Sequence, residues 1–205
     1  MNKSRPARTI GEKEVRQLLA QCADTRYPRR NRLIVLLTYD AGLKVGEISQ
    51  ARRSHMMRNG ELVPELQVFR HRKARIVPMT DRLFAACLDM LRGLPGLPEM
   101  PLILSERSTD LLTPMRPDSI AYLLYRLFEK AGIEGASSHS GRRAFLQRAM
   151  IATKHVEGAT LKDVQMIGGF SHLEALRPYE VSSGDPEAQR RLIQSLVKRP
   201  ENGTA

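Results

Sequence analysis

The chain has 205 residues, which is enough for one domain, or for one domain with a tail. Hydrophobic residues make up 41% of it, which excludes a largely disordered chain, and no stretch approaches the roughly 20 apolar residues of a membrane span. The 33 Lys and Arg against 22 Asp and Glu leave a formal charge of +11. This surplus favours a polyanionic partner, and nucleic acid is the commonest one in the cytoplasm.

The basic N-terminus is not followed by an apolar segment, so we expect no secretory signal and a cytoplasmic location. The chain has two cysteines, Cys22 and Cys87, and both lie among apolar residues. They are expected to be reduced thiols in the core rather than a disulfide or a zinc site. No metal and no cofactor are expected.

Hydrophobic spacing predicts a helical N-terminal part. The first helix is expected to begin near Thr9, with its hydroxyl as the cap and Glu12 reaching back to it. A second helix is expected from Pro28 to Gly42. Its run LIVLL is apolar on nearly all sides, which predicts a central buried helix. A short helix is expected over Val45 to Arg52.

The middle of the chain changes from helical to strand-like patterns. Asn59-Gly60 is a strong tight-turn signal. The segments 66–70 and 75–79 are expected to be two strands joined by the basic tip HRKA. Thr80 is then expected to cap another helix.

The C-terminal part is again mostly helical. Residues 101–105 are expected to form a short buried strand or an extended piece. Further helices are expected to begin at Pro117, after Ser140-Gly141, at Thr160 and at Asp185. The sum is an α+β fold, mainly α-helical, with a small antiparallel sheet.

Five features occur in a fixed order along the chain. They are AGLKVGEIS (41–49), the strand pair with its basic tip followed by IVPM, HSGR (139–142), IGGFSH (167–172) and Tyr179. In this order and spacing, over about residues 8–183, the chain resembles the catalytic domain of the tyrosine recombinases, the phage-integrase and Xer-like family. The resemblance implies a site-specific DNA recombinase or integrase that cuts and rejoins duplex DNA through a 3′-phosphotyrosine, without metal or ATP.

The resemblance also implies roles for individual residues. Tyr179 takes the position of the nucleophile, and Arg142 that of an arginine that grips the scissile phosphate. His139 takes the general acid–base position. Lys44 stands where the family has its first arginine, and Phe170 where a His or Trp usually hydrogen-bonds the phosphate.

The hairpin residue that protonates the leaving oxygen is left open. Counting back from Pro78 selects Arg70, whereas Lys73 at the tip is the better proton donor because guanidinium hardly deprotonates. Clustered cations at the hairpin and elsewhere predict contacts with the DNA backbone. The expected DNA-binding residues are Arg52, Arg53, Arg70, Arg72, Lys73, Arg75 and Arg143.

Three departures from the family pattern favour an alternative function. Lys44 keeps the charge but not the bidentate fork of arginine, Arg70 is a poor acid, and Phe170 cannot donate a hydrogen bond. The alternative is a catalytically impaired, recombinase-derived DNA-binding regulator or accessory protein. A type IB topoisomerase and a basic module that binds RNA or a protein are weaker alternatives.

The expected organisation is a flexible basic arm (1–8), a catalytic domain (9–183) and a C-terminal amphipathic helix with a tail (184–205). Because about eight residues precede the first helix, we expect the separate N-terminal domain of the family to be absent. The expected partner is double-stranded DNA, with a homo-oligomer, a tetramer on two sites, assembling there. The oligomeric state off DNA is left open, and no membrane partner is expected.

Overall fold

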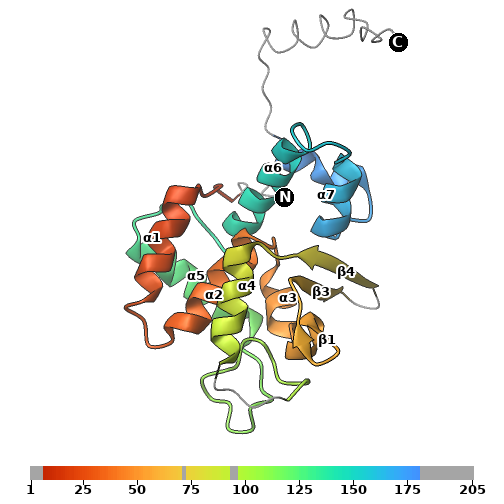
Figure 1. The fold of residues 1–205 in the computed structure, drawn as a ribbon. Coiled ribbons are helices and arrows are strands. Elements are labelled where there is room, and N and C mark those ends of the chain that lie inside the picture. Colours follow the sequence, from red (N-terminus) through yellow and green to blue (C-terminus); the bar gives the residue numbers. More distant parts are fainter. Residues whose placement is uncertain (1–6, 71–72, 93–96, 181–205) are drawn as a thin grey trace, which may run out of the picture.

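The computed structural model describes residues 7–70, 73–92 and 97–180 (Figure 1). Helices precede and follow a block of two short two-stranded sheets, which confirms the mainly helical α+β fold. The helices are α1 (Glu12–Cys22), α2 (Pro28–Tyr39), α3 (Val45–Gln50), α4 (Asp81–Leu91), α5 (Pro117–Lys130), α6 (Ser140–Ala152) and α7 (Leu161–Gly168), with 3-10 helices η1 (Arg53–Met56) and η2 (Leu173–Tyr179). The strands are β1 (Met57–Arg58), β2 (Glu61–Leu62), β3 (Glu65–Arg70) and β4 (Lys73–Pro78). The helix expected from Asp185 lies outside the described residues.

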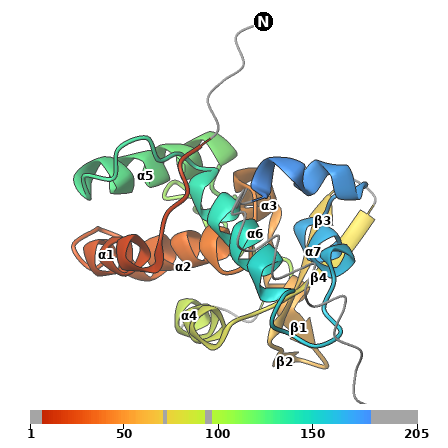
Figure 2. The ribbon, with the colours of Figure 1, turned by 90° about the horizontal axis from the view of Figure 1, so that it is seen from above.

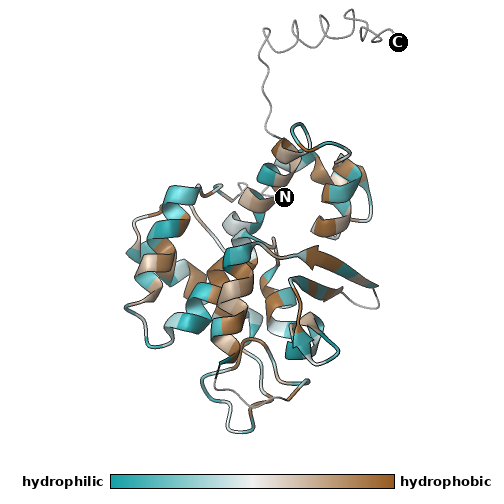
Figure 3. Ribbon diagram, viewed as in Figure 1, coloured by the Kyte–Doolittle hydropathy of each residue, from teal (hydrophilic) through white to brown (hydrophobic). Residues whose placement is uncertain are grey.

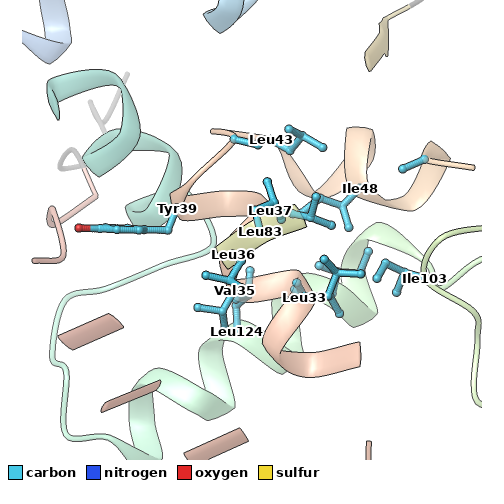
Figure 4. Close-up of a cluster of buried hydrophobic side chains, with 14 of the residues drawn as sticks. Leu33, Val35, Leu36, Leu37, Tyr39, Leu43, Ile48, Leu83, Ile103 and Leu124 are labelled. Carbon is cyan, nitrogen blue, oxygen red and sulfur yellow. The ribbon is translucent and has the colours of Figure 1, made fainter. Parts of the chain in front are cut away.

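Helix α2 is the centre of the main core, as its all-round apolar run predicts. Every residue from Leu33 to Leu37 is buried, and Tyr39 is buried at the C-terminal end. The helices α1, α4 and α6 pack around it, and Figure 4 shows its side chains meeting Leu83 of α4 and Leu124 of α5. Because this core holds α2 in place, it also fixes the start of the following loop, which carries Lys44.

The start of α1 differs from the prediction. Gly11, not Thr9, is the N-cap, and the Glu14 carboxylate accepts a hydrogen bond of 2.8 Å from the Gly11 N–H. The Thr9 hydroxyl instead donates to Gln147 on α6, at 2.8 Å. The helix therefore begins later because the expected cap is used in a contact between distant segments. Hydrophilic and hydrophobic residues alternate along α1 (Figure 3), as expected for a helix with one face on the core.

Two antiparallel hairpins follow α3. Asn59 and Gly60 have φ values of 52° and 85° and join β1 to β2, which confirms the tight turn. Strands β3 and β4 pair from Glu65 opposite Pro78 to Arg70 opposite Lys73. There are thus two small sheets among the described residues instead of the single sheet expected.

Residues 101–105 form the extended piece and not a strand, because only isolated pairings are made, by Pro101 and Leu104. The Leu102 N–H donates to the Ala51 carbonyl and holds this piece behind α3. The predicted cap of α4 is confirmed, since Thr80 accepts from the Leu83 N–H. Cys22 and Cys87 are confirmed as buried free thiols. In the described part of the chain, no helix is long and apolar enough to cross a membrane.

The last described elements form a separate small layer. Helix α6 lies between the helical body of α1, α2, α4 and α5 and the α7–η2 pair (Figures 1 and 2). Leu146, Val164 and Leu176 make a second buried cluster that joins α6, α7 and η2. This layer brings the ends of α7 and η2 next to the first turn of α6.

Candidate active site at the start of helix α6

Arg142 is the most deeply placed charged residue of the candidate site. It lies in the first turn of α6 and is only 3% exposed. One terminal nitrogen of its guanidinium donates to the Gly42 carbonyl at 2.5 Å, and the other donates to the Gly168 carbonyl at 2.6 Å. The guanidinium therefore joins the loop after α2 to the end of α7.

The electrostatics of Arg142 suit a fixed cation. Burial lowers the pKa of Arg142, and the Glu47 carboxylate and the Tyr179 side chain act against that shift. A guanidinium still stays protonated, because its ordinary pKa lies far above neutral pH. Its buried Nε has no hydrogen-bond partner in the structure. An oriented, incompletely satisfied cation of this kind is suited to bind a phosphate oxygen.

Tyr179 lies beside this cation, at the end of η2, and is half-buried. Its ring packs against Phe170, with 5.8 Å between the ring centroids, and the guanidinium carbon of Arg143 lies 5.7 Å from its centroid. Phe170 in turn lies under Arg142, whose guanidinium carbon is 5.1 Å from the Phe170 centroid. The structure thus brings together four of the residues singled out in the sequence. Arg143, expected as a DNA contact, stands beside the Tyr179 ring.

His139 is the N-cap residue of α6 and is exposed. It precedes Arg142 by three residues, and residues three apart on a helix share a face. Its backbone N–H donates to the Ser137 hydroxyl at 3.2 Å, which fixes the approach to the helix. His139 is therefore an exposed residue at the start of the helix that carries Arg142.

Lys44 is the N-cap residue of α3 and is half-buried. Its backbone N–H donates to the Glu47 carboxylate at 2.9 Å, so Glu47 closes the first turn of α3. One of the two carbonyls that accept hydrogen bonds from Arg142 belongs to Gly42, two residues before Lys44. This places the start of α3 next to the guanidinium of Arg142.

Arg75 occupies a different position from the one its sequence context predicts. It was expected on the DNA-binding hairpin tip, but its side chain is turned inward and is 11% exposed. It forms a bidentate ion pair with Glu47, at 2.8 and 3.0 Å, and its Nε donates to the Ile167 carbonyl at 2.8 Å. Burial by itself raises the pKa of Glu47, but the hydrogen bonds from Arg75 and from the Lys44 backbone outweigh it and lower the pKa. Glu47 is therefore the ionised partner of Arg75 in this ion pair.

The remaining hairpin cations are placed as follows. Arg70 and Lys73 are cross-strand partners at the last paired position of β3 and β4, and Lys73 is exposed. Arg72 lies outside the described residues. A cavity of about 1060 Å³ opens between β4 and α7, and both Lys73 and Phe170 line it. Lys73 therefore lines the same cavity as Phe170, which belongs to the candidate site.

Arg52 contacts a segment outside this arrangement. Arg52 donates to the Glu99 carbonyl at 2.7 Å and forms an ion pair with the Glu99 carboxylate at 3.3 Å. Arg53 is half-buried in η1. Across the described ranges, no cluster of three or more His, Cys, Asp or Glu side chains is arranged to hold a metal ion.

Sequence reasoning missed the two backbone carbonyls that hold Arg142, and the inward position of Arg75. The inward position of Arg75 could have been predicted from the sequence. Side chains alternate along a strand, so Arg75 faces the same side of β4 as the buried Val77. The two carbonyls could not have been predicted, because the approach of Gly42 and Gly168 to Arg142 is a property of tertiary packing.

Comparison with solved structures defines the class of fold. The crystal structure of the XerA recombinase superposes with a TM-score of 0.67 at 22% identity, over 96% of this chain and 68% of that one. The XerH site-specific recombinase bound to its difH substrate gives 0.72 at 17% identity, over 97% and 56%. The fold is therefore that of a tyrosine recombinase catalytic domain.

The family follows from the sequence comparisons. The model of the phage integrase family matches residues 8–184, and the chain belongs to this family. The tyrosine recombinase XerA of Thermococcus kodakarensis is 28% identical over 172 residues, which are 84% of this chain and 57% of that protein. Transposase A from transposon Tn554 of Staphylococcus aureus is 24% identical, over 96% of this chain and 55% of that protein. The chain spans little more than half the length of these two relatives.

Proposed function

We propose that this protein cuts and rejoins duplex DNA by transesterification, with Tyr179 as the nucleophile. The observation that carries the proposal is the placement of the half-buried Tyr179 ring against Phe170, which also contacts the buried Arg142 guanidinium. Cations beside an attacking phenol stabilise the negative charge that develops as it bonds to phosphorus. Arg142 and Arg143 are the cations that flank it.

The proposed reaction conserves the energy of the phosphodiester bond. The Tyr179 oxygen forms a bond to phosphorus, its proton leaves, and the bond from phosphorus to the 5′-oxygen breaks. The strand is then held as a 3′-phosphotyrosine, and the leaving 5′-oxygen takes a proton. Attack by a 5′-hydroxyl reverses these steps on the same or another strand. Because the bond energy is kept, rejoining needs no ATP.

Each of the other residues has a proposed role in that cycle. Arg142 and Lys44 bind the phosphate oxygens and stabilise charge that develops on them, the task that metal ions perform in other phosphoryl-transfer enzymes. His139 is the proposed general acid–base group for the phenol proton. Lys73 is the proposed acid for the leaving oxygen, with Arg70 as the competitor.

Duplex DNA is the proposed substrate. The net charge of +11 supplies the electrostatic attraction. The solved relatives with this fold include the XerH recombinase on its difH substrate and the Tn1549 integrase in complex with transposon right end DNA. We further propose that the protein assembles as a homo-tetramer on two sites when it acts, since one protomer carries one nucleophile and exchange of two duplexes involves four strands.

The second candidate is a DNA-binding regulator that does not cleave. Phe170 favours it, because this side chain lies at the candidate site and has no hydrogen-bond donor for the phosphate. The two candidates differ in what Tyr179 does. In a regulator, Tyr179→Phe leaves DNA binding and function unchanged, whereas in a recombinase it abolishes strand cleavage.

Covalent trapping tests the proposal. Nicked suicide duplexes taken from the DNA that flanks the gene are mixed with the protein, and a denaturant-resistant adduct is sought. The proposal expects an adduct that is lost in Tyr179→Phe and kept in Tyr125→Phe, a matched change at an exposed tyrosine of α5. A duplex that is bound in a gel shift but yields no adduct would favour the regulator.

A further inference from the structure

We propose that Phe170 is a positioning residue that fixes the Arg142 guanidinium and the Tyr179 ring relative to each other through its two contacts. The inference rests on the proposed function, since it assigns a task to Phe170 in strand cleavage. Phe170 has no polar atom in its side chain, so its task is not to bind the phosphate. It acts by holding Arg142, the proposed phosphate-binding group, and Tyr179, the proposed nucleophile.

The backbone of Phe170 is held from both sides. Its N–H donates to the Gln165 carbonyl at 3.0 Å, and the Gln165 side-chain amide donates to the Phe170 carbonyl at 3.2 Å. Gly169 has a φ of 67°, in the left-handed region that favours glycine, and this residue turns the chain at the end of α7. The ring therefore leaves the backbone from a defined place.

The space for the ring is created by Gly168. A Cβ atom at Gly168 would lie 2.8 Å from two carbons of the Phe170 ring and 3.0 Å from Leu146. The same residue offers its carbonyl to Arg142 at 2.6 Å. One residue thus both admits the aromatic ring and anchors the cation that stacks on it.

The ring then contacts both groups that it is proposed to position. The Arg142 guanidinium carbon is 5.1 Å from its centroid, within range of a cation–π interaction. The Tyr179 ring is 5.8 Å away at an interplanar angle of 55°, a tilted aromatic pair. Phe170 and Tyr179 also pack on the small core formed by Leu146, Val164 and Leu176. Loss of the ring would remove the cation–π contact of Arg142 and the aromatic contact of Tyr179.

The first test measures cleavage in a single turnover. Phe170→Leu keeps an apolar side chain and removes the aromatic face. We expect the cleavage rate constant to fall by about 10²-fold, the effect of misplaced reacting groups, with DNA affinity unchanged. Phe170→Tyr and Phe170→Trp keep the face and should restore cleavage. The control Phe128→Leu alters a buried phenylalanine of the main core and should leave cleavage per folded molecule unchanged. A Phe170→Leu protein that cleaves at the wild-type rate would overturn the inference.

The second test does not depend on cleavage. Arginine is labelled with ¹⁵N, and the Arg142 Nε–H signal is assigned by its loss in Arg142→Lys. We expect hydrogen exchange at this group to be faster in Phe170→Leu than in wild type and to return to the wild-type rate in Phe170→Tyr. Equal exchange rates in all three would overturn the positioning role. If the wild-type protein forms no Tyr179 adduct, the proposed function fails, and the exchange rates alone decide the role of Phe170.

Discussion

Arg75 and Glu47 form a buried bidentate ion pair that joins strand β4 to helix α3. The pair extends in both directions, since Glu47 also accepts from the Lys44 N–H and Arg75 also donates to the Ile167 carbonyl. The end of α7 is thereby held by two arginines, Arg75 at Ile167 and Arg142 at Gly168. The hairpin, the start of α3 and the segment leading to Tyr179 are thus fixed relative to one another.

Removing one partner of this pair should destabilise the fold. Arg75→Ala leaves the Glu47 carboxylate buried without its counter-charge, and we expect the free energy of unfolding to fall by about 3–5 kcal/mol. Urea denaturation measures the change. The control Arg58→Ala removes an exposed arginine of β1 and should change it by no more than about 0.5 kcal/mol. If Arg75→Ala keeps full stability and instead weakens DNA binding, Arg75 contacts DNA as its sequence context predicts.

The same pair should give the protein a specific acid sensitivity. The pKa of Glu47 is lower in the folded protein than in the unfolded chain, since the bonds from Arg75 and Lys44 outweigh its burial. A lowered folded pKa contributes stability above the unfolded pKa of about 4.3, and the contribution is lost as the pH falls through the folded value. The stability difference between wild type and Glu47→Gln should therefore be constant above about pH 5 and shrink below about pH 4.

Unfolding free energies measured from pH 3 to pH 7 check this expectation. Glu61→Gln, which changes an exposed carboxylate of β2, serves as the matched control. A Glu47→Gln difference that stays constant down to pH 3 would show that the carboxylate is not held by the pair.

Local chemistry in the sequence predicts much of this fold. The run LIVLL predicts the buried α2, Asn59-Gly60 predicts the first hairpin, and Thr80 predicts the cap of α4, because each depends on neighbours within a few residues. Thr9 shows the limit. It had the right chemistry for a cap, but a contact with Gln147, far along the chain, takes its hydroxyl.

The candidate site also has features that the sequence predicts and features that depend on tertiary contacts. The motif order selected Arg142, Phe170 and Tyr179, and the structure brings them together. It did not show that the Arg142 guanidinium is held between two carbonyls, since backbone groups carry no mark in the sequence. Composition counted Arg75 among the tip cations, although its phase with Val77 in β4 indicates an inward side chain.

Lys44→Arg should raise the rate of strand cleavage. Lys44 carries one point charge, whereas a guanidinium binds two phosphate oxygens at once. The backbone contact of this residue with Glu47 does not depend on the side chain, so the substitution preserves the start of α3. We expect a gain of about tenfold or more in the single-turnover rate constant with little change in stability. An unchanged or lower rate would show that the side chain at position 44 does not reach the scissile phosphate.

Lys73 should be the acid that protonates the leaving 5′-oxygen. It lines the same cavity as Phe170, and an ammonium group loses its proton far more readily than the guanidinium of Arg70. Lys73→Ala should lower cleavage of an ordinary duplex by about 10²-fold or more. A duplex in which sulfur replaces the bridging 5′-oxygen has a leaving group that needs no proton, so Lys73→Ala should cleave it at nearly the wild-type rate.

Arg70→Ala provides the matched comparison, because Arg70 is the backbone partner of Lys73 across the hairpin. If Arg70 only contacts DNA, its loss should slow both duplexes equally, and raising the DNA concentration should restore the rate. Rescue by the sulfur duplex in Arg70→Ala, and its absence in Lys73→Ala, would assign the acid to Arg70 instead. The hairpin would then follow the family position counted from Pro78, and the shared cavity would not indicate the proton donor.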